Sequence, residues 1–281
     1  MDWSKAKTIL IVAFILTNIL LGVVLFSDDY KTETTTTQGF VEDVTRILEK
    51  KDIIIDTEVS TEIPSLNTLT IEYEMIDIQA INDNFFNGEG KTEAEGHDVV
   101  KVWNNNEYIT INNRKVLLYE NNNEVEKYKD LDIEKAKDIA IEFLTERKYD
   151  VSDMKVSYKK NDNDNYYIEF SKVYKERYLE KATTTIEIDK RGVKRFMRIW
   201  LNFIEEGETP RYISTAPKAI LSLLSIEESY GRTIKDISLC YYFDPSEQED
   251  IKDTKNARKG QTVPAWRVLF EDGFKIIIDN Y

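Results

Sequence analysis

The feature that most constrains this chain is an uncharged apolar run near its N-terminus. Residues 8–26 read TILIVAFILTNILLGVVLF, nineteen residues without an acidic or basic side chain. At about 1.5 Å per residue, a helix of this length reaches roughly 28 Å, close to the ~30 Å hydrocarbon core of a bilayer. The chain beyond residue 26 is far more polar. The sequence therefore predicts one membrane-spanning helix that carries a single large part outside the membrane.

The residues that flank this run predict its orientation. Lys5 and Lys7 precede it, and Asp28 and Asp29 follow it. Because lysine and arginine near a span stay on the cytoplasmic side, we expect a cytoplasmic N-terminus and an extracellular part at residues 27–281. A cleaved signal peptide is the alternative. Since no small-x-small pattern ends the run, an uncleaved anchor in the cell membrane is favoured.

Two residues inside the run are candidates for contact with another membrane helix. Asn18 and Gly22 lie four residues apart and so share one face of the helix. An amide in hydrocarbon tends to find a partner, and a glycine beside it lets another backbone come close. The alternative is that a single asparagine is simply tolerated in a strongly apolar helix.

The bulk composition limits the function classes. The formal net charge is −14, and residues 1–26 contribute one positive charge, so the exterior carries about −15. This balance argues against nucleic acid as a partner and against adhesion to anionic lipid. The single cysteine, Cys240, allows no internal disulfide and excludes the small disulfide-stapled class.

The pattern of the exterior predicts an α+β fold in which antiparallel-sheet domains each pack one or two helices, since runs of strands are interrupted by single helices. We expect a stub and spanning helix at 1–29, a tether at 30–38, one extracellular domain at 39–129 and a second at 130–281. Periodicity predicts helices at 40–49, 78–86, 130–149 and 216–226, and a loop at 87–96. Strands are expected at 53–59, 66–78, 98–103, 107–111, 114–120, 154–160, 165–176, 181–189, 194–203, 234–243, 264–271 and 274–280.

Catalytic chemistry finds little support in the sequence. His97 is the only histidine, and about 140 residues separate it from Cys240, which sits in an apolar strand pattern, so a buried cysteine and a loop histidine are favoured over a catalytic pair. Residues 161–165, NDNDN, lack the glycine and glutamate of an EF-hand loop and are interpreted as a solvated hairpin turn. We therefore predict a non-enzymatic protein with no catalytic residues, no cofactor and no metal site.

Both ends of the chain resemble a known family. The start, MDWSKAKTIL, runs into an asparagine-containing apolar helix, and residues 264–276 read PAWRVLFEDGFKI. These features resemble the YycI (WalI) family of Gram-positive regulators and its companion YycH, whose PAWR-type ending they share. The resemblance covers both ends and the overall plan, whereas residues 30–260 carry no matching motif. The family ending continues into an Asn-Ala-x-x-Gly finish, whereas this chain reads IIIDNY and stops.

The resemblance implies a membrane-anchored protein that modulates a sensor histidine kinase of the WalK (YycG) type and so affects cell-wall homeostasis. The implied partners are that kinase and a YycH-like protein, with the transmembrane helices taking part in the complex. Trp266 and Arg267 occupy the matching motif positions. Since neighbouring strand residues face opposite ways, we expect one of them to pack and the other to point outward. Anchoring of the last hairpin is favoured over a binding role.

A second hypothesis is a membrane-anchored extracellular binding module for a cell-wall polymer or peptide. Tyrosine-rich strands motivate it, because aromatic rings provide stacking surfaces. The tyrosines concerned are Tyr166, Tyr167, Tyr174 and Tyr178. Strand core and cross-strand pairing are the commoner use of such residues.

Overall fold

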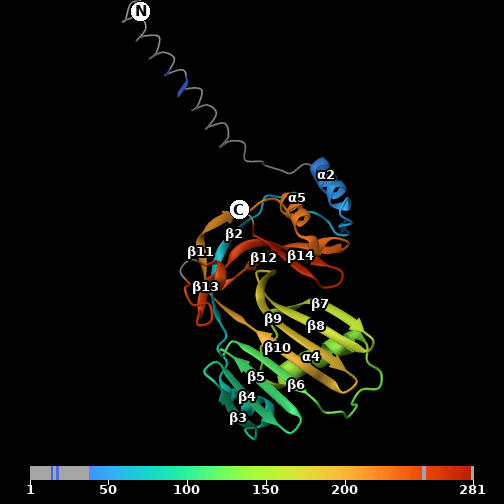
Figure 1. The fold of residues 1–281 in the computed structure, drawn as a ribbon, viewed down its shortest axis with the longest axis vertical. Coiled ribbons are helices and arrows are strands. Elements are labelled where there is room, and N and C mark those ends of the chain that lie inside the picture. The colour runs from blue at the N-terminus through green and yellow to red at the C-terminus, as the bar shows by residue number, and fades with distance from the viewer. Residues whose placement is uncertain (1–13, 15–16, 19–37, 249–250, 280–281) are drawn as a thin grey trace, which may run out of the picture.

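The computed structural model describes residues 14, 17–18, 38–248 and 251–279 (Figure 1). The predicted span at 8–26 and the tether up to residue 37 lie almost wholly outside these residues. Within the described part, no helix is long and apolar enough to cross a membrane. The anchor and its orientation therefore stay predictions.

The described part is mixed α+β with mostly antiparallel strands, as predicted. Its helices are α2 (Gln38–Glu49), α3 (Ile78–Phe86), α4 (Ile133–Glu146) and α5 (Ala216–Ile220), with 3-10 turns at Leu221–Ser225, Glu227–Ser229 and Pro245–Glu247. The first strands are β1 (Ile54–Ile55), β2 (Ser65–Tyr73), β3 (Lys91–Glu95), β4 (Val99–Asn104), β5 (Glu107–Asn112), β6 (Val116–Asn121), β7 (Met154–Asp162) and β8 (Asn165–Tyr174). The remaining strands are β9 (Arg177–Asp189), β10 (Gly192–Ile199), β11 (Leu201–Tyr212), β12 (Thr233–Tyr242), β13 (Lys259–Gln261), β14 (Val263–Phe270) and β15 (Lys275–Ile278).

One large sheet runs through the molecule. Its twelve strands follow the main path β15-β14-β12-β9-β10-β6-β5-β4-β3, while β8 with β7 branches from β9, and β1 pairs with β12. Only the β1–β12 and β12–β9 pairs are parallel. A second sheet of three strands has the order β11-β2-β13. The β6–β10 pair carries the large sheet across the boundary expected at residues 129 and 130, and the division into two domains stays a prediction.

Three apolar cores hold the elements together. At one end of the long axis, α2 and α5 lie close to β12 and β14, and at the other end lie β3 to β6 (Figure 1). The first of these ends is built on a core that includes Val44 and Leu48 of α2 and Trp266 of β14. The opposite end packs α3 and α4 on the sheet through Phe86, Phe143 and Phe196. A third core joins β2, β9, β11 and β12 between them.

The helix beginnings follow from local capping. Asp132 is extended, and its carboxylate accepts a hydrogen bond from the Lys135 backbone N–H at 2.8 Å, so it caps α4. Asp77 does the same for α3, accepting the amides of Gln79 and Ala80. The α3 bounds match the predicted range 78–86.

Several expected elements differ from the structure. The strand expected at 66–78 ends at Tyr73, and the helix expected at 130–149 is limited to Ile133–Glu146. The loop expected at 87–96 contains β3, which was missed because all five of its residues are exposed and show no apolar alternation. The strand expected at 194–203 divides at Trp200: β10 belongs to the large sheet, and β11 turns into the small one. The helix expected at 216–226 ends at Ile220 and continues as a 3-10 turn. The strand expected at 53–59 shortens to the two residues that pair with β12.

Candidate functional site: an acidic tyrosine cleft above a buried ion network

Trp266 and Arg267 occupy the middle of β14 and face opposite ways, as the strand period requires. Trp266 is 3% exposed, packs in the core shared with α2 and α5, and donates its indole N–H to the Ser214 carbonyl at 2.7 Å. The expectation that one of the pair points outward is wrong, because Arg267 is 1% exposed. Its strand lies between β12 and β15 and is covered on both faces.

Arg267 is the centre of a buried ion network. Its Nη1 donates to Asp236 Oδ2 at 2.6 Å, and its Nη2 donates to the Ser157 carbonyl at 3.1 Å. Its Nε lies 3.0 Å from Glu180 Oε1, an ion pair without the angle of a hydrogen bond. The guanidinium also lies over the Tyr178 ring, 4.6 Å from its centroid. Four strands that are distant in sequence, β7, β9, β12 and β14, therefore meet at one cation.

Lys275 of β15 extends the network to β8. Its ammonium lies 3.2 Å from Glu180 Oε2 and 2.9 Å from Glu169 Oε1. The Ser157 hydroxyl donates to the same Glu169 oxygen at 2.6 Å. Burial by itself raises the pKa of Glu169, but Lys275, Ser157 and Arg267 outweigh it and hold that pKa below its usual value. Glu169 is therefore ionised in the neutral range.

An irregularity in β9 places Glu180 in this network. Ser171 pairs with Thr183, whereas the next residue, Lys172, pairs with Leu179, so residues 180–182 have no partner on β8. Such a bulge bends the strand and turns side chains away from the regular alternation. Lys181 within it has a φ of 74°. Glu180 is only 4% exposed as a result of this arrangement.

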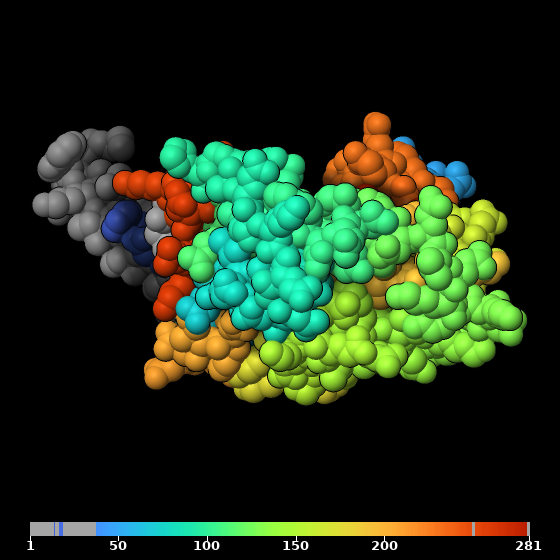
Figure 2. All heavy atoms as spheres, turned by 90° about the horizontal axis from the view of Figure 1, so that it is seen from below, coloured from blue at the N-terminus to red at the C-terminus, as the bar shows by residue number. Residues whose placement is uncertain are grey.

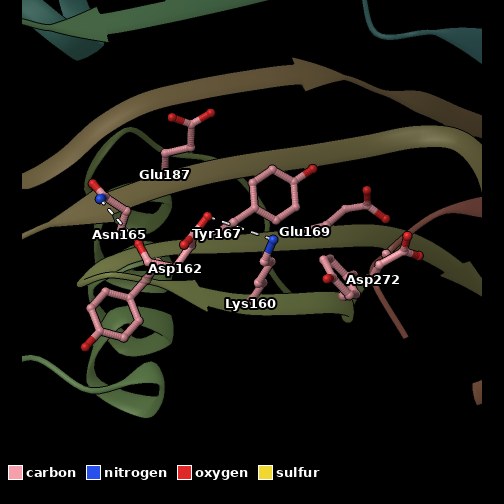
Figure 3. Close-up of a pocket in the computed structure, with 10 residues that line it drawn as sticks. Lys160, Asp162, Asn165, Tyr167, Glu169, Glu187 and Asp272 are labelled. Atoms are coloured by element: carbon pink, nitrogen blue, oxygen red, sulfur yellow. Dashed lines mark hydrogen bonds and ion pairs between the residues drawn. The ribbon is translucent and has the colours of Figure 1, made fainter. Parts of the chain in front are cut away.

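Above the network lies a cleft with a volume of about 370 Å³. Figure 3 shows Asp162 and Asn165 at one end, Glu169 and Asp272 at the other, and Tyr167 between them. The cleft is lined by Tyr158, Lys160, Asp162, Asn165, Tyr166, Tyr167, Glu169, Glu187, Asp272 and Gly273. We call it the tyrosine cleft. Because Glu169 belongs to both the cleft and the ion network, the two form one continuous site.

The β14–β15 turn closes one side of the tyrosine cleft. Gly273 has a φ of 89°, and a Cβ added there would lie 2.5 Å from the Tyr158 ring. Only glycine permits both this backbone conformation and this close approach. The turn that follows the family-like PAWR segment is thereby packed directly on an aromatic wall of the cleft.

The chemistry of the tyrosine cleft is that of a site for a cationic group. Its lining has four carboxylates, Asp162, Glu169, Glu187 and Asp272, against the single ammonium of Lys160. Two cations outside the lining, Lys275 and Arg232, pair with Glu169 and Asp272, so the unbalanced negative charge lies with Asp162 and Glu187. The rings of Tyr158 and Tyr167 lie 6.1 Å apart. Burial raises the pKa of both phenols, assisted by Glu169, and brings that of Tyr167 to about 12, so both stay neutral. Neutral tyrosine faces beside carboxylates attract ammonium or guanidinium groups.

The NDNDN segment forms a rim of this cleft. β7 ends at Asp162 and β8 begins at Asn165, with Asn163 and Asp164 between them at φ values of 52° and 64°. Two residues at positive φ are typical of a type I′ hairpin turn. The hairpin-turn interpretation is confirmed, and asparagine and aspartate are there because they tolerate this conformation.

The only histidine and the only cysteine lie far apart. Cys240 is fully buried in β12, and burial raises the pKa of its thiol well above the ordinary value. His97 lies in the turn between β3 and β4, at the far end of the sheet. Five strand spacings of about 4.8 Å separate β12 from β4, roughly 24 Å. The structure does not bring the two side chains together.

Of the predicted membrane contacts, Asn18 is described and Gly22 lies outside the described residues. Asn18 is exposed and helical, and its side-chain amide donates to the Phe14 carbonyl at 3.0 Å. This bond lies within one turn of its own helix. The contact role of Asn18 and Gly22 stays a prediction.

The four tyrosines proposed as stacking surfaces divide between core and site. Tyr166 is 3% exposed, and its hydroxyl reaches the Leu131 carbonyl. The Tyr174 ring stacks on the Phe203 ring with 4.4 Å between the ring centroids, and the Tyr178 ring lies under the Arg267 guanidinium. Tyr166 and Tyr167 both line the cleft, and Tyr167, which is only half-buried, is the more accessible of the two.

Sequence reasoning missed Tyr158, Glu169, Glu180 and Lys275. The contacts of Lys275 join positions 95 and 106 residues apart, with Glu180 and Glu169 respectively. Local periodicity carries no signal of such pairing. The one available signal was Arg267 itself, since a buried strand with an arginine in it requires carboxylates nearby.

Comparison with solved structures finds matches at low sequence identity, and the first of those that follow shares the fold. An uncharacterized protein from Eubacterium rectale matches with a TM-score of 0.51 and 14% identity, over 85% of this chain and 96% of that one. YycH from Bacillus subtilis matches with a TM-score of 0.49 and 11% identity, over 75% of this chain and 52% of that one. The C-terminal domain of YpeB from Bacillus megaterium gives 0.38 and 9%, over 88% and 94%. No family model and no curated protein sequence matches the chain.

Proposed function

We propose that this chain is a non-enzymatic regulatory protein of the YycI type, anchored in the cell membrane by residues 8–26 with its α+β part outside. In this proposal it modulates a sensor histidine kinase of the WalK (YycG) type, together with a YycH-like protein, and so affects cell-wall homeostasis. The resemblance of both chain ends to the YycI and YycH families motivates it.

The observation that carries this proposal is the position of the family-like segment in the fold. Trp266 packs in the same core as Val44 and Leu48 of α2, the helix that follows the predicted tether. Its neighbour Arg267 ties that core to β7 and β9. The segment thus links the end of the fold that carries α2 to the tyrosine cleft, and this supports a regulator in which events at the cleft reach the predicted membrane helix.

The test is photocrosslinking from position 18 of the full-length protein in its own host. Asn18 is replaced by a photoreactive residue, and position 20, on roughly the opposite helix face, serves as the matched control. We expect an adduct with the kinase or a YycH-like protein from position 18, weakened by Gly22→Leu, and none from position 20. Lipid-only adducts from both positions, or release of the protein from the membrane by cleavage, would contradict the proposal.

A second candidate function is an anchored binding module for a cell-wall polymer or peptide, and the tyrosine cleft favours it. Neutral tyrosine rings and four carboxylates suit a peptide that carries free amino groups. The full-length protein in detergent is titrated calorimetrically with a lysine-containing wall peptide. We expect Tyr167→Leu to abolish binding and Tyr212→Leu, on the exposed end of β11, to leave it unchanged. Equal binding by both variants would exclude the cleft.

A further inference from the structure

Four segments that are distant in sequence enclose a second pocket, of about 330 Å³, at the end of the molecule that carries β3 to β6. They are the β2–α3 connection, the β3–β4 turn, the β5–β6 turn and the segment that precedes β13. Figure 2 shows this last segment, in red-orange, beside the blue-green chain of the first three. We call this hollow the basic pocket.

Hydrogen bonds join the segments into one frame. The Asn113 amide donates to the Asp98 carbonyl at 2.7 Å, and the Ile76 amide donates to the Arg114 carbonyl at 2.7 Å. Asn113 and Arg114 both have positive φ values, 50° and 55°. This tight turn places the side chains of Arg114 and Lys115 at the pocket.

The pocket reverses the charge of its surroundings. The exterior as a whole carries about −15. The pocket lining nevertheless includes His97 and four basic side chains against the single carboxylate of Asp98, the basic residues being Arg114, Lys115, Lys255 and Arg258. Within the residues that the structure describes, none of the four forms an ion pair, whereas the next residue, Lys259, lies 3.6 Å from Glu72.

Lys115 forms the buried floor of this pocket. It is 8% exposed, and its ammonium donates to the Lys255 carbonyl at 2.5 Å and lies 4.6 Å from the centroid of the Tyr73 ring. Burial lowers the pKa of Lys115; Asp253 opposes this shift, and Arg258 adds to it. A buried ammonium surrounded by like charges is destabilised, and an anion beside it relieves that cost.

We infer that the basic pocket binds an organic phosphate, with the phosphate group held by Arg114, Lys115, Lys255 and Arg258. Arginine side chains offer planar forks that match phosphate oxygens, and lysines add point charges. The volume exceeds what a phosphate group alone fills, and the remaining wall is apolar, built from Met75, Ile78, Val100 and Ile111. The ligand is therefore a phosphate ester whose organic part packs on these side chains. This site is separate from the tyrosine cleft and goes beyond the proposed function.

Glycerol 3-phosphate is the first probe, titrated calorimetrically into the full-length protein in a non-ionic detergent at constant ionic strength. Arg258→Gln and Lys255→Gln are the test variants, because their frame contacts are made by backbone atoms and survive the change. Lys259→Gln is the matched control, since it removes the same charge one residue away. We expect about tenfold weaker binding in each test variant, the loss of one charge-assisted hydrogen bond, and no change in the control.

Further ligands separate the sources of the phosphate group. A phosphodiester polymer that binds more tightly per phosphate than glycerol 3-phosphate assigns the pocket to a polymer, and the reverse order assigns it to a free metabolite; both support the site. Acetate binding as tightly as glycerol 3-phosphate overturns the phosphate assignment. An equal loss in Lys259→Gln and Arg258→Gln, or no heat of binding at millimolar ligand, overturns the site itself.

Discussion

The two faces of strand β14 each centre on a buried side chain, Trp266 or Arg267, but are held in different ways. On one face, Trp266, Val268 and Phe270 pack with α2 and α5 in an apolar core. On the other face, Arg267 lies among Glu180, Asp236 and Lys275. Trp266 and Arg267 are 3% and 1% exposed, so burial does not distinguish these two residues, although Asp236 on the ionic face keeps 40% of its side chain exposed.

The difference lies in what each face requires of its neighbours. Apolar packing is non-directional, and similar shapes substitute for one another at modest cost. A buried ion network is directional, since removing one member leaves the others charged and unpaired. Each apolar side chain therefore adds a small stabilisation that does not depend on one particular neighbour. The ionic face, in contrast, fixes the positions of β7, β8 and β9 relative to β14.

The largest effect is expected from Arg267→Ala. It leaves Glu180, which is 4% exposed, without its guanidinium partner, and we expect the free energy of unfolding to fall by about 3–5 kcal/mol. Denaturant unfolding of the full-length protein in detergent measures the loss. Arg195→Ala on the exposed side of β10 is the control, with a change of less than about 0.5 kcal/mol.

The double variant Arg267→Met with Glu180→Gln sharpens this prediction. It removes both partners of the buried pair, and we expect it to recover much of the stability that Arg267→Ala loses. If the double variant is as unstable as the single one, shape and not unpaired charge explains the loss, and the comparison of the two faces fails.

A smaller loss is expected on the apolar face from Trp266→Phe. A smaller aromatic ring replaces the indole, and the 2.7 Å hydrogen bond to the Ser214 carbonyl disappears, at a cost of about 1–3 kcal/mol. The same unfolding measurement gives the value. A loss as large as that of Arg267→Ala would show that the two faces respond alike.

Acidification should weaken the ionic face selectively. The folded-state pKa of Glu169 lies below its ordinary value of 4.5, so its stabilising contribution is present above that value and is lost as pH falls through the folded pKa. We expect the stability difference between wild type and Glu169→Gln to be largest at neutral pH and to shrink below pH 4.5. Glu187→Gln, which removes another cleft carboxylate but no bond to Lys275, is the control. A difference that is constant with pH would contradict this account.

The smallest effect is expected at an exposed ion pair. Arg46 and Asp43 on α2 lie 3.1 Å apart with 69% and 63% of their side chains exposed. Asp43→Asn should change the free energy of unfolding by less than about 0.5 kcal/mol in the same assay. A loss of several kcal/mol here would remove the distinction between buried and exposed charge on which the comparison depends.

Local signals in the sequence predicted most elements of this fold. The bounds of α3 and the cap of α4 follow from their own residues, as does the NDNDN turn. Strand β3 was not predicted because all of its residues are exposed and show no apolar alternation. Strand β11 was not predicted as a separate strand because no local feature shows that the chain passes from the large sheet to the small one at Trp200. Local sequence patterns predict strand alternation and helix caps, but they do not predict which strands pair with one another.

The candidate site shows the same limit more sharply. Tyr167 was noticed for its strand context, and Arg267 for its motif. Glu180 reaches Arg267 only because three residues of β9 bulge out of register, and Lys275 reaches Glu169 across 106 positions. Such side-chain contacts depend on the tertiary arrangement, so the spacing of residues in the sequence cannot predict them.

Because the chain has a single cysteine, its fold contains no internal disulfide that an oxidising or reducing environment could form or break. Cys240 is closed inside β12, and its raised pKa suppresses the thiolate that disulfide exchange requires. The fold therefore needs neither an oxidant to complete it nor a reductant to protect it. A chain of this kind needs no disulfide-forming enzyme in order to fold.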